Sequence, residues 1–253
     1  FRRVLFRSLV TTPESLCLML AERDAALRFR ELRCVIVDEW HDLMASKRGV
    51  QVELALARLR RFHPDLRTWG LSATLRDAPA AAARLCGVDA DPLVVRDEIA
   101  RPVVVRSLLP DDAETLPWAG HLGLRMAPRL LEFLDPDVPT LVFTNTRSQA
   151  ERWYGEILRA RPEWMERLAL HHGSIDRSVR TRIERGLKSG DITLAVCTSS
   201  LDLGIDFSPI QRVVQIGSPK GIARLIQRAG RSGHRHGESC EVTCVPTYAL
   251  ELV

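Results

Sequence analysis

The sequence predicts an α/β protein built on parallel sheets, and three observations support this fold class. The apolar, β-branched run at 32–37 is typical of a strand buried on both faces, as strands of parallel sheets are. From residue 140 onward, short apolar runs alternate with amphipathic segments, which indicates repeated strand–helix units. A polar connection at 97–101 separates two such regions, so we expect two domains, 1–97 and 98–253.

In the first region, the expected strands lie at 9–10, 32–37, 66–71 and 93–96. A helix should begin at Pro13 with Thr12 as its N-cap, because proline suits the first helical turn. Val52, Leu56 and Leu59 share one face of a second, amphipathic helix. An alanine-rich helix at 77–86 should end at Gly87.

In the second region, we expect strands at 102–109, 140–144, 168–171, 192–197, 212–216 and 241–245. The expected helices open at Asn145-Thr146-Arg147, follow Gly173-Ser174 and span 221–228. This regular alternation predicts helices on a parallel sheet.

Composition limits the class of protein. Of the 253 residues, 45% are hydrophobic, as in an ordinary globular protein that can bury one large or two modest cores. No apolar run reaches the ~18 residues of a membrane span. The charge of +4 and the isoelectric point near 8.9 are compatible with nucleic acid without requiring it. Six scattered cysteines favour reduced thiols, and Cys240 and Cys244 are expected to be strand residues because nothing nearby completes a metal site.

The stretch Asp38-Glu39-Trp40-His41 follows the first long apolar run directly. Ligands of parallel α/β sheets bind outside the carboxyl ends of the strands. Two adjacent carboxylates at such an end suit a nucleotide site, where one holds Mg²⁺ and the other orients or deprotonates the attacking water. A helix N-terminal cap is the alternative interpretation, and the pair by itself does not decide between them.

Two further stretches carry candidate chemistry. Ser72-Ala73-Thr74 ends a strand with hydroxyls that could respond to His41 and a nucleotide, although a simple turn is the alternative. At 227–235, Arg228 and Arg231 share a helix face, and the glycines at 230 and 233 let backbone approach a phosphate. A solvated basic helix end would explain one or two of these arginines but not the glycines. At 171–172 two histidines are adjacent, which disfavours a shared metal because neighbouring strand side chains point to opposite faces.

In this order and spacing, the stretches at 38–41, 72–74, 198–206 and 227–235 resemble motifs II, III, V and VI of the superfamily 2 helicases. The tryptophan of motif II, with the segments 11–16 and 245–253, most resembles the Lhr (long helicase-related) family and, within it, the ligase-associated DEXH-box helicases of bacteria. The resemblance covers almost the whole chain.

The resemblance implies roles for individual residues. Those that would act on ATP are Asp38, Glu39, His41, Gln227, Arg228 and Arg231, the last as an arginine finger. Those that would face ATP are Asp38, Ser72, Thr74, Gly204 and Asp206, and Asp38 and Glu39 would hold Mg²⁺. Those that would contact the nucleic-acid backbone are Thr12, Pro13, Glu14, Thr144, Asn145, Arg147, Thr198 and Ser199. His234 stands where many relatives have a second arginine, which leaves the role of Arg235 in doubt.

The resemblance also implies two RecA-like lobes, the first incomplete, with ATP between them and single-stranded nucleic acid across both. The implied activity is an ATP-dependent, 3′-to-5′ DNA helicase or translocase of the bacterial cytosol and nucleoid, acting in repair with partners such as a ligase or nuclease. No Gly-x-x-x-x-Gly-Lys-Ser/Thr loop occurs in the chain, so we expect a piece of a longer helicase that hardly hydrolyses ATP by itself.

Three other functions stay open from the sequence. An RNA or RNA:DNA-hybrid helicase would carry the same motifs. A nucleic-acid-binding module without ATPase activity would keep the backbone contacts alone. A remodelling or restriction-type translocase fits the tryptophan of motif II and the 245–253 segment less well.

Overall fold

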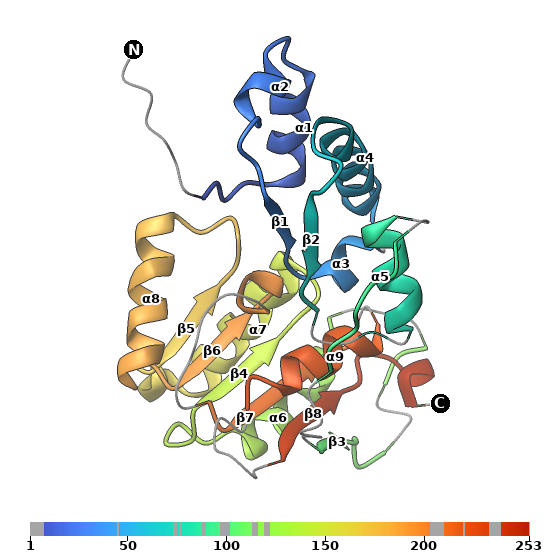
Figure 1. Ribbon diagram of the computed structural model, residues 1–253. Helices are drawn as coiled ribbons and strands as arrows, with labels where there is room; N and C mark the ends of the chain where they lie inside the picture. The colour runs from blue at the N-terminus through green and yellow to red at the C-terminus, as the bar shows by residue number, and fades with distance from the viewer. Residues whose placement is uncertain are drawn as a thin grey trace. The chain divides into compact units, whose positions relative to one another are not determined.

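In the computed structural model, the chain forms two compact units, Phe1–Glu98 and Ile99–Val253, each with its own sheet (Figure 1). The structure describes residues 8–44, 46–72, 75, 77–87, 90–96, 102–112, 116–118, 122–202, 210–219, 221–232 and 239–252. The predicted α/β class is confirmed, because the strands of both sheets pair in parallel and helices pack against them.

Unit 1 is built on two parallel strands, β1 (Cys34–Val37) and β2 (Arg67–Gly70), paired in register from Cys34 with Arg67 to Val37 with Gly70. Its helices are α1 (Pro13–Ala21), α2 (Ala25–Arg28), α3 (Trp40–Met44), α4 (Lys47–Phe62) and α5 (Ala78–Cys86). The predicted apolar face of α4 is confirmed, since Val52, Leu56 and Leu59 are all buried.

Some sequence predictions for unit 1 are wrong. The runs at 9–10 and 93–96 form no strand, and their apolar side chains lie in solvent, with Val10 97% and Leu93 88% exposed. Such short runs become strands only where a neighbouring strand accepts their hydrogen bonds. Burial on both faces is also wrong for β1, because the paired side chains of Ile36 and Trp69 are both more than half exposed.

Unit 2 is a six-stranded parallel sheet in the order β3-β8-β7-β4-β6-β5. Its strands are β3 (Val103–Ser107), β4 (Thr140–Phe143), β5 (Leu168–His171), β6 (Leu194–Cys197), β7 (Arg212–Ile216) and β8 (Cys240–Val245). Its α-helices are α6 (Ala127–Phe133), α7 (Arg147–Ala160), α8 (Arg177–Ser189) and α9 (Ile222–Ala229). Short 3₁₀ turns are η2 (Leu124–Met126), η3 (Pro162–Trp164), η4 (Ser199–Leu201) and η5 (Ala249–Leu252).

The core of unit 2 has two halves, one on each face of the sheet. Val142 of β4 packs in a cluster with Trp153 of α7. Its neighbour Phe143 packs in a second cluster with Leu187 of α8 and Ala229 of α9. Because alternate residues of a strand point to opposite faces, the sheet is covered by helices on both sides. Every loop that leaves the carboxyl end of these parallel strands therefore emerges at the same edge.

Sequence signals explain the helix boundaries next to that edge. Thr146 caps α7 by accepting a hydrogen bond from the backbone N–H of Gln149 at 3.2 Å. Asp176 caps α8 in the same way through Ser178. Gly190 ends α8 at φ +84°, a left-handed conformation that glycine adopts without strain. These caps fix where α7 and α8 begin relative to the strand ends, and so where their first side chains lie.

Candidate functional site

The acid pair of unit 1 lies on a tightly held turn at the end of β1. The Asp38 carboxylate accepts a hydrogen bond from the backbone N–H of Glu39 at 2.9 Å. On either side, the Leu71 N–H donates to the Val37 carbonyl at 2.9 Å and the Trp40 N–H donates to the Leu71 carbonyl at 3.0 Å. The ladder between β1 and the chain after β2 thus brackets the acid pair.

The turn holds Glu39 in an unusual backbone conformation. Its φ of +50° is the one left-handed value among the described residues other than glycine. Such a conformation costs about 1–3 kcal/mol and persists where the surroundings impose it. Here Trp40 anchors the turn, since its side chain is 2% exposed and its indole N–H donates to the Ala81 carbonyl of α5 at 2.9 Å. The packing of Trp40 thus fixes the direction of the Glu39 side chain, and the cost is strain in the backbone.

His41 connects this carboxylate to the end of β2. Its Nδ1 lies 2.9 Å from the Ser72 hydroxyl and 3.6 Å from Glu39 Oε2. The structure therefore brings together three residues that the sequence placed in two separate motifs. Thr74, predicted to act beside Ser72, lies outside the described residues. Asp38 is exposed, so its second carboxylate oxygen fits the water-rich coordination that Mg²⁺ prefers.

The predicted helix start at Thr12 and Pro13 is present, and Thr12 accepts from the Ser15 N–H at 3.3 Å. Glu14 is engaged by an arginine that the sequence reading missed. Arg48 of α4 donates to the Glu14 carboxylate from Nε at 2.8 Å and from Nη2 at 3.4 Å. Backbone hydrogen bonding at the helix start, followed by Arg48, lowers the pKa of Glu14. A carboxylate kept ionised repels phosphate, so Glu14 is better placed to orient Arg48 than to contact nucleic acid itself.

Arg228 of unit 2 is buried, which corrects its predicted contact with ATP. Its side chain is 1% exposed and donates to Asp202 from Nε at 2.7 Å and from Nη2 at 3.2 Å. A third donor meets the Gln215 side chain, and the guanidinium lies 4.6 Å from the centre of the Phe143 ring. This geometry leaves no surface for a phosphate, so we assign Arg228 to holding the loop after β6 against α9.

Asp202 is the residue on which this arrangement converges. Arg224 lies 3.6 Å from its carboxylate, and Arg231 donates from Nε to its backbone carbonyl at 3.1 Å. Spacings of four and three place Arg224, Arg228 and Arg231 on one side of the helix and its following turn. The sequence reading passed over Asp202, although an acid directly after a buried strand and a 3₁₀ turn was a usable signal. Gln227 is half-buried on the same helix, while Gly204 and Asp206 lie outside the described residues.

The ends of β4 and β6 hold the predicted contacts to a nucleic-acid backbone. Thr144 is fully buried, and its hydroxyl lies 3.1 Å from the Cys197 carbonyl, so it joins the two strands and does not face a ligand. Asn145 donates from Nδ2 to the Ser218 carbonyl at 2.9 Å. Arg147 is exposed and donates to the Ser174 hydroxyl at 3.1 Å. With Thr198 half-buried and Ser199 exposed, Arg147 and these two hydroxyl residues remain available at this edge.

His171, at the end of β5, links the loop after β6 to α8. It is fully buried, with Nδ1 2.8 Å from the Ser200 hydroxyl and Nε2 3.2 Å from the Glu184 carboxylate. Burial lowers the pKa of His171, and the opposing effect of Glu184 is smaller. A neutral imidazole can accept from Ser200 and donate to Glu184, so both nitrogens are satisfied without a charge.

The described residues form no metal cluster, no disulfide and no membrane-spanning helix. Within the described ranges, no three His, Cys, Asp or Glu side chains are grouped as a metal site would need. All six cysteines are free thiols, and Cys240 and Cys244 lie in β8. A search of the described helices finds none with both the length and the apolar character of a membrane span.

Comparisons with protein families agree with this division of chemistry. Residues 3–82 match the DEAD/DEAH box helicase family, and residues 125–236 match the helicase conserved C-terminal domain. One α/β unit of this chain holds an acid pair and the other holds an arginine cluster. Together with the two family matches, this makes the chain a member of the superfamily 2 helicases.

Individual relatives narrow the class. The ATP-dependent helicase Lhr-Core protein 2 of Thermococcus barophilus is 39% identical over 238 residues, which are 90% of this chain and 27% of that protein. The Lhr helicase/uracil glycosylase of Escherichia coli is 33% identical over 97% of this chain and 19% of its own length. The structure of Mycobacterium smegmatis helicase Lhr bound to ssDNA and AMP-PNP is similar with a TM-score of 0.81 and 33% identity, over 96% of this chain and 32% of that one. The chain belongs to the Lhr family of superfamily 2 helicases.

A further solved helicase is similar to this chain, and the chain covers only part of each of these relatives. The DUF1998 helicase MrfA bound to DNA is similar with a TM-score of 0.71 and 26% identity, covering 93% of this chain and 34% of that chain. The chain spans about a quarter of the length of the Lhr-Core relatives, at 27% and 28%.

Proposed function

We propose that this chain supplies part of the motor of a DNA helicase, one that couples ATP hydrolysis to 3′-to-5′ movement on single-stranded DNA. The observation that carries the proposal is the Glu39–His41–Ser72 arrangement, in which an aimed carboxylate is connected to the end of the neighbouring strand. A helix cap would explain an acid at this position. It would not explain why packing holds Glu39 in a strained conformation.

In this proposal each unit contributes part of the ATP chemistry. Glu39 orients or deprotonates the attacking water, and Asp38 would hold Mg²⁺. The bound metal would neutralise charge on the phosphates. Arg231 supplies positive charge to the transferred phosphoryl group, as arginine fingers do. Ser72 reports the state of this site through His41, because a hydroxyl 2.9 Å from the imidazole responds to any shift of the ring.

The nucleic-acid contacts we propose read the backbone and not the bases. In unit 2 they come from Arg147, Thr198 and Ser199, which remain accessible at the carboxyl edge of the sheet. In unit 1 they come from the capped start of α1 and from Arg48 beside it. Arginine and hydroxyl side chains are common phosphate ligands and carry no sequence information themselves. The helicase should therefore act on DNA of any sequence, in keeping with a role in repair alongside a ligase or nuclease.

The test is DNA-stimulated ATP hydrolysis by the whole protein that carries these two units. Glu39→Gln should lower turnover by about 10²–10⁴ while single-strand binding persists, because only the proton acceptor is lost. Arg231→Ala should lower turnover by about 10³–10⁵. The matched control is Glu31→Gln, which neutralises an exposed carboxylate of the same unit.

The same assay separates the alternatives. Competition of single-stranded DNA against RNA distinguishes a DNA from an RNA motor, and duplexes with a 3′ or a 5′ tail report polarity. Turnover that persists at the wild-type rate in Glu39→Gln would exclude this assignment of the acid pair. A protein that binds DNA without DNA-stimulated turnover would be a binding module.

A further inference from the structure

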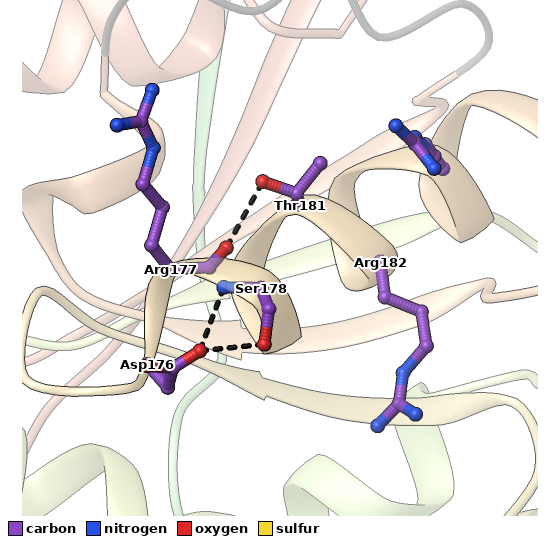
Figure 2. Close-up of a pocket in the computed structure, with 6 residues that line it drawn as sticks. Asp176, Arg177, Ser178, Thr181 and Arg182 are labelled. Atoms are coloured by element: carbon purple, nitrogen blue, oxygen red, sulfur yellow. Dashed lines mark hydrogen bonds between the residues drawn. The ribbon is translucent and has the colours of Figure 1, made fainter.

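The outer face of α8 carries a cluster of cations that no step of the proposed motor uses. Val179, Ile183 and Leu187 turn inward toward the sheet. The opposite face carries the side chains that line a shallow surface hollow together with a lysine at the end of the helix: Arg177, Ser178, Thr181, Arg182, Arg185 and Lys188. Figure 2 shows Arg177 and Arg182 pointing away from each other on either side of Ser178 and Thr181.

Within the described ranges, the cations of this face have no acidic partners. In the described part of the chain, Arg177, Arg182, Arg185 and Lys188 make no side-chain hydrogen bond or ion pair. Arg106, Arg159 and Arg167, three other exposed arginines of unit 2, are instead paired with Glu241, Glu156 and Asp137. Four unpaired cations on one helix face repel one another, and a polyanion would relieve that repulsion.

The two acids of this region are already engaged. Asp176 accepts from the backbone N–H and the hydroxyl of Ser178 at the start of α8, and these hydrogen bonds lower its pKa. Glu184, four residues before Lys188, is turned toward His171, with its carboxylate 3.2 Å from Nε2. Because Asp176 also lines the hollow, a small anion there would face a carboxylate. A longer ligand, with negative charges spaced along the helix, could contact the cations and avoid the Asp176 carboxylate.

We propose that this α8 face binds the sugar-phosphate backbone of duplex DNA, next to the single strand held at the carboxyl edge of the sheet. From Arg177 to Lys188 the helix rises about 16 Å, which is several phosphates of one strand. Proteins that grip single strands add aromatic side chains on which bases stack. α8 contains no aromatic residue, so its face suits a duplex, whose bases are stacked inside.

The place of α8 next to the proposed single-strand contacts also favours duplex DNA as the ligand. This step rests on the proposed function. Arg147, proposed to hold the single strand, donates to the Ser174 hydroxyl at 3.1 Å. Ser174 precedes Arg177 by three residues, so the α8 face begins where the proposed single-strand contacts end. A DNA whose single-stranded tail lies along that edge would bring its duplex portion to the arginines.

The experiment compares two triple variants of the whole protein with equal loss of charge. One is Arg182→Gln, Arg185→Gln and Lys188→Gln, which removes three of the four cations of the α8 face. The control is Arg106→Gln, Arg159→Gln and Arg167→Gln, three exposed arginines that are paired with acids. Binding is measured at several salt concentrations with a single strand, a blunt duplex and a 3′-tailed duplex.

We expect the α8 triple to weaken binding of both duplex substrates about 10- to 100-fold at low salt. Its log–log salt slope for the blunt duplex should fall by about 2–3, because each lost contact to B-DNA contributes about 0.9. Binding of the single strand should match that of the control triple. Unchanged thermal unfolding shows that the variants are folded.

The outcomes separate this inference from the proposed function. Equal effects of the two triples on the duplex would overturn the inference, even if the wild type binds single strands and hydrolyses ATP. A selective effect on single-strand binding would overturn it as well. If the wild type shows no DNA-stimulated turnover but the α8 triple alone loses duplex binding, the α8 surface stands and the motor does not.

Discussion

Unit 2 has two arginine-bearing helices whose arginines lie in opposite surroundings. On α9, Arg228 is buried and paired with Asp202, and its neighbours Arg224 and Arg231 meet the same residue. On α8, Arg182 and Arg185 are exposed and have no ion pair among the described residues. Arg228, within the stretch at 227–235, is thus a structural residue, whereas Arg182 and Arg185, which lie in none of the motifs, are available to a ligand. Burial and pairing, and not residue type, decide the role.

The largest effect should come from breaking the buried pair. Arg228→Ala leaves the Asp202 carboxylate with fewer partners inside the protein, which should cost unit 2 about 3–5 kcal/mol. For a unit of this size, that lowers the melting temperature by roughly 10 °C. Arg185→Ala should change stability by less than about 0.5 kcal/mol, since its side chain stands in solvent. Hydrogen exchange of the β4 amides measures the stability of unit 2 directly.

A double replacement sharpens this test. Arg228→Met with Asp202→Leu removes both charges, so no buried carboxylate remains, and the double variant should be more stable than Arg228→Ala. The difference reports how much of the loss is an uncompensated charge and how much is lost packing over the Phe143 ring. Arg228→Ala and Arg185→Ala with similar stabilities would show that the two helices do not differ in this way.

The sequence predicted the strand ends of the site well, because local signals mark them. An apolar run followed by Asp38 and Glu39 and a threonine cap at Thr146 can both be read from neighbouring residues. The pairing of Arg228 with Asp202 spans 26 residues and depends on how α9 packs on the sheet. No local pattern distinguishes an arginine that meets an acid from one that meets a ligand, so the two helices could not be told apart in advance.

Two strand predictions were wrong for the same reason, while the other predicted strands are present. The runs at 9–10 and 93–96 have strand-like composition, yet no strand among the described residues pairs with them. On β1, Ile36 belongs to an apolar run, but its face of the two-strand sheet is exposed. The composition of a segment shows only that it can form a strand. Whether it does so, and which face is buried, depends on a partner elsewhere in the chain.

A second prediction concerns His171, which contacts α8 through Glu184 and the turn after β6 through Ser200. Its pKa in the folded protein lies below the ordinary value of about 6.5, because burial disfavours the imidazolium. As the pH falls below 6.5, the unfolded chain therefore binds a proton that the folded chain does not. Unit 2 should lose stability over this range by at most about 1.4 kcal/mol per pH unit.

The measurement is the stability of unit 2 between pH 7.5 and 5 in the wild type and in His171→Asn. The variant should show a flatter profile, since its amide does not titrate, even if its stability at pH 7.5 is lower. A pH profile that is equally steep in both would assign the acid sensitivity to other groups. It would also show that the connection between α8 and the turn after β6 does not depend on a neutral imidazole.

The smallest effect concerns Glu39 of unit 1, a site residue that packing holds in a strained backbone conformation. At φ +50° glycine is favoured over alanine, so Glu39→Gly should be about 1 kcal/mol more stable than Glu39→Ala, and both variants lose the carboxylate. At Glu53, inside α4, the same pair of substitutions should have the opposite order, because glycine weakens a helix by about 1 kcal/mol relative to alanine. Urea unfolding of the four variants checks the sign. If glycine is the less stable replacement at both positions, the Glu39 turn stores no strain, and its conformation does not point to a functional constraint.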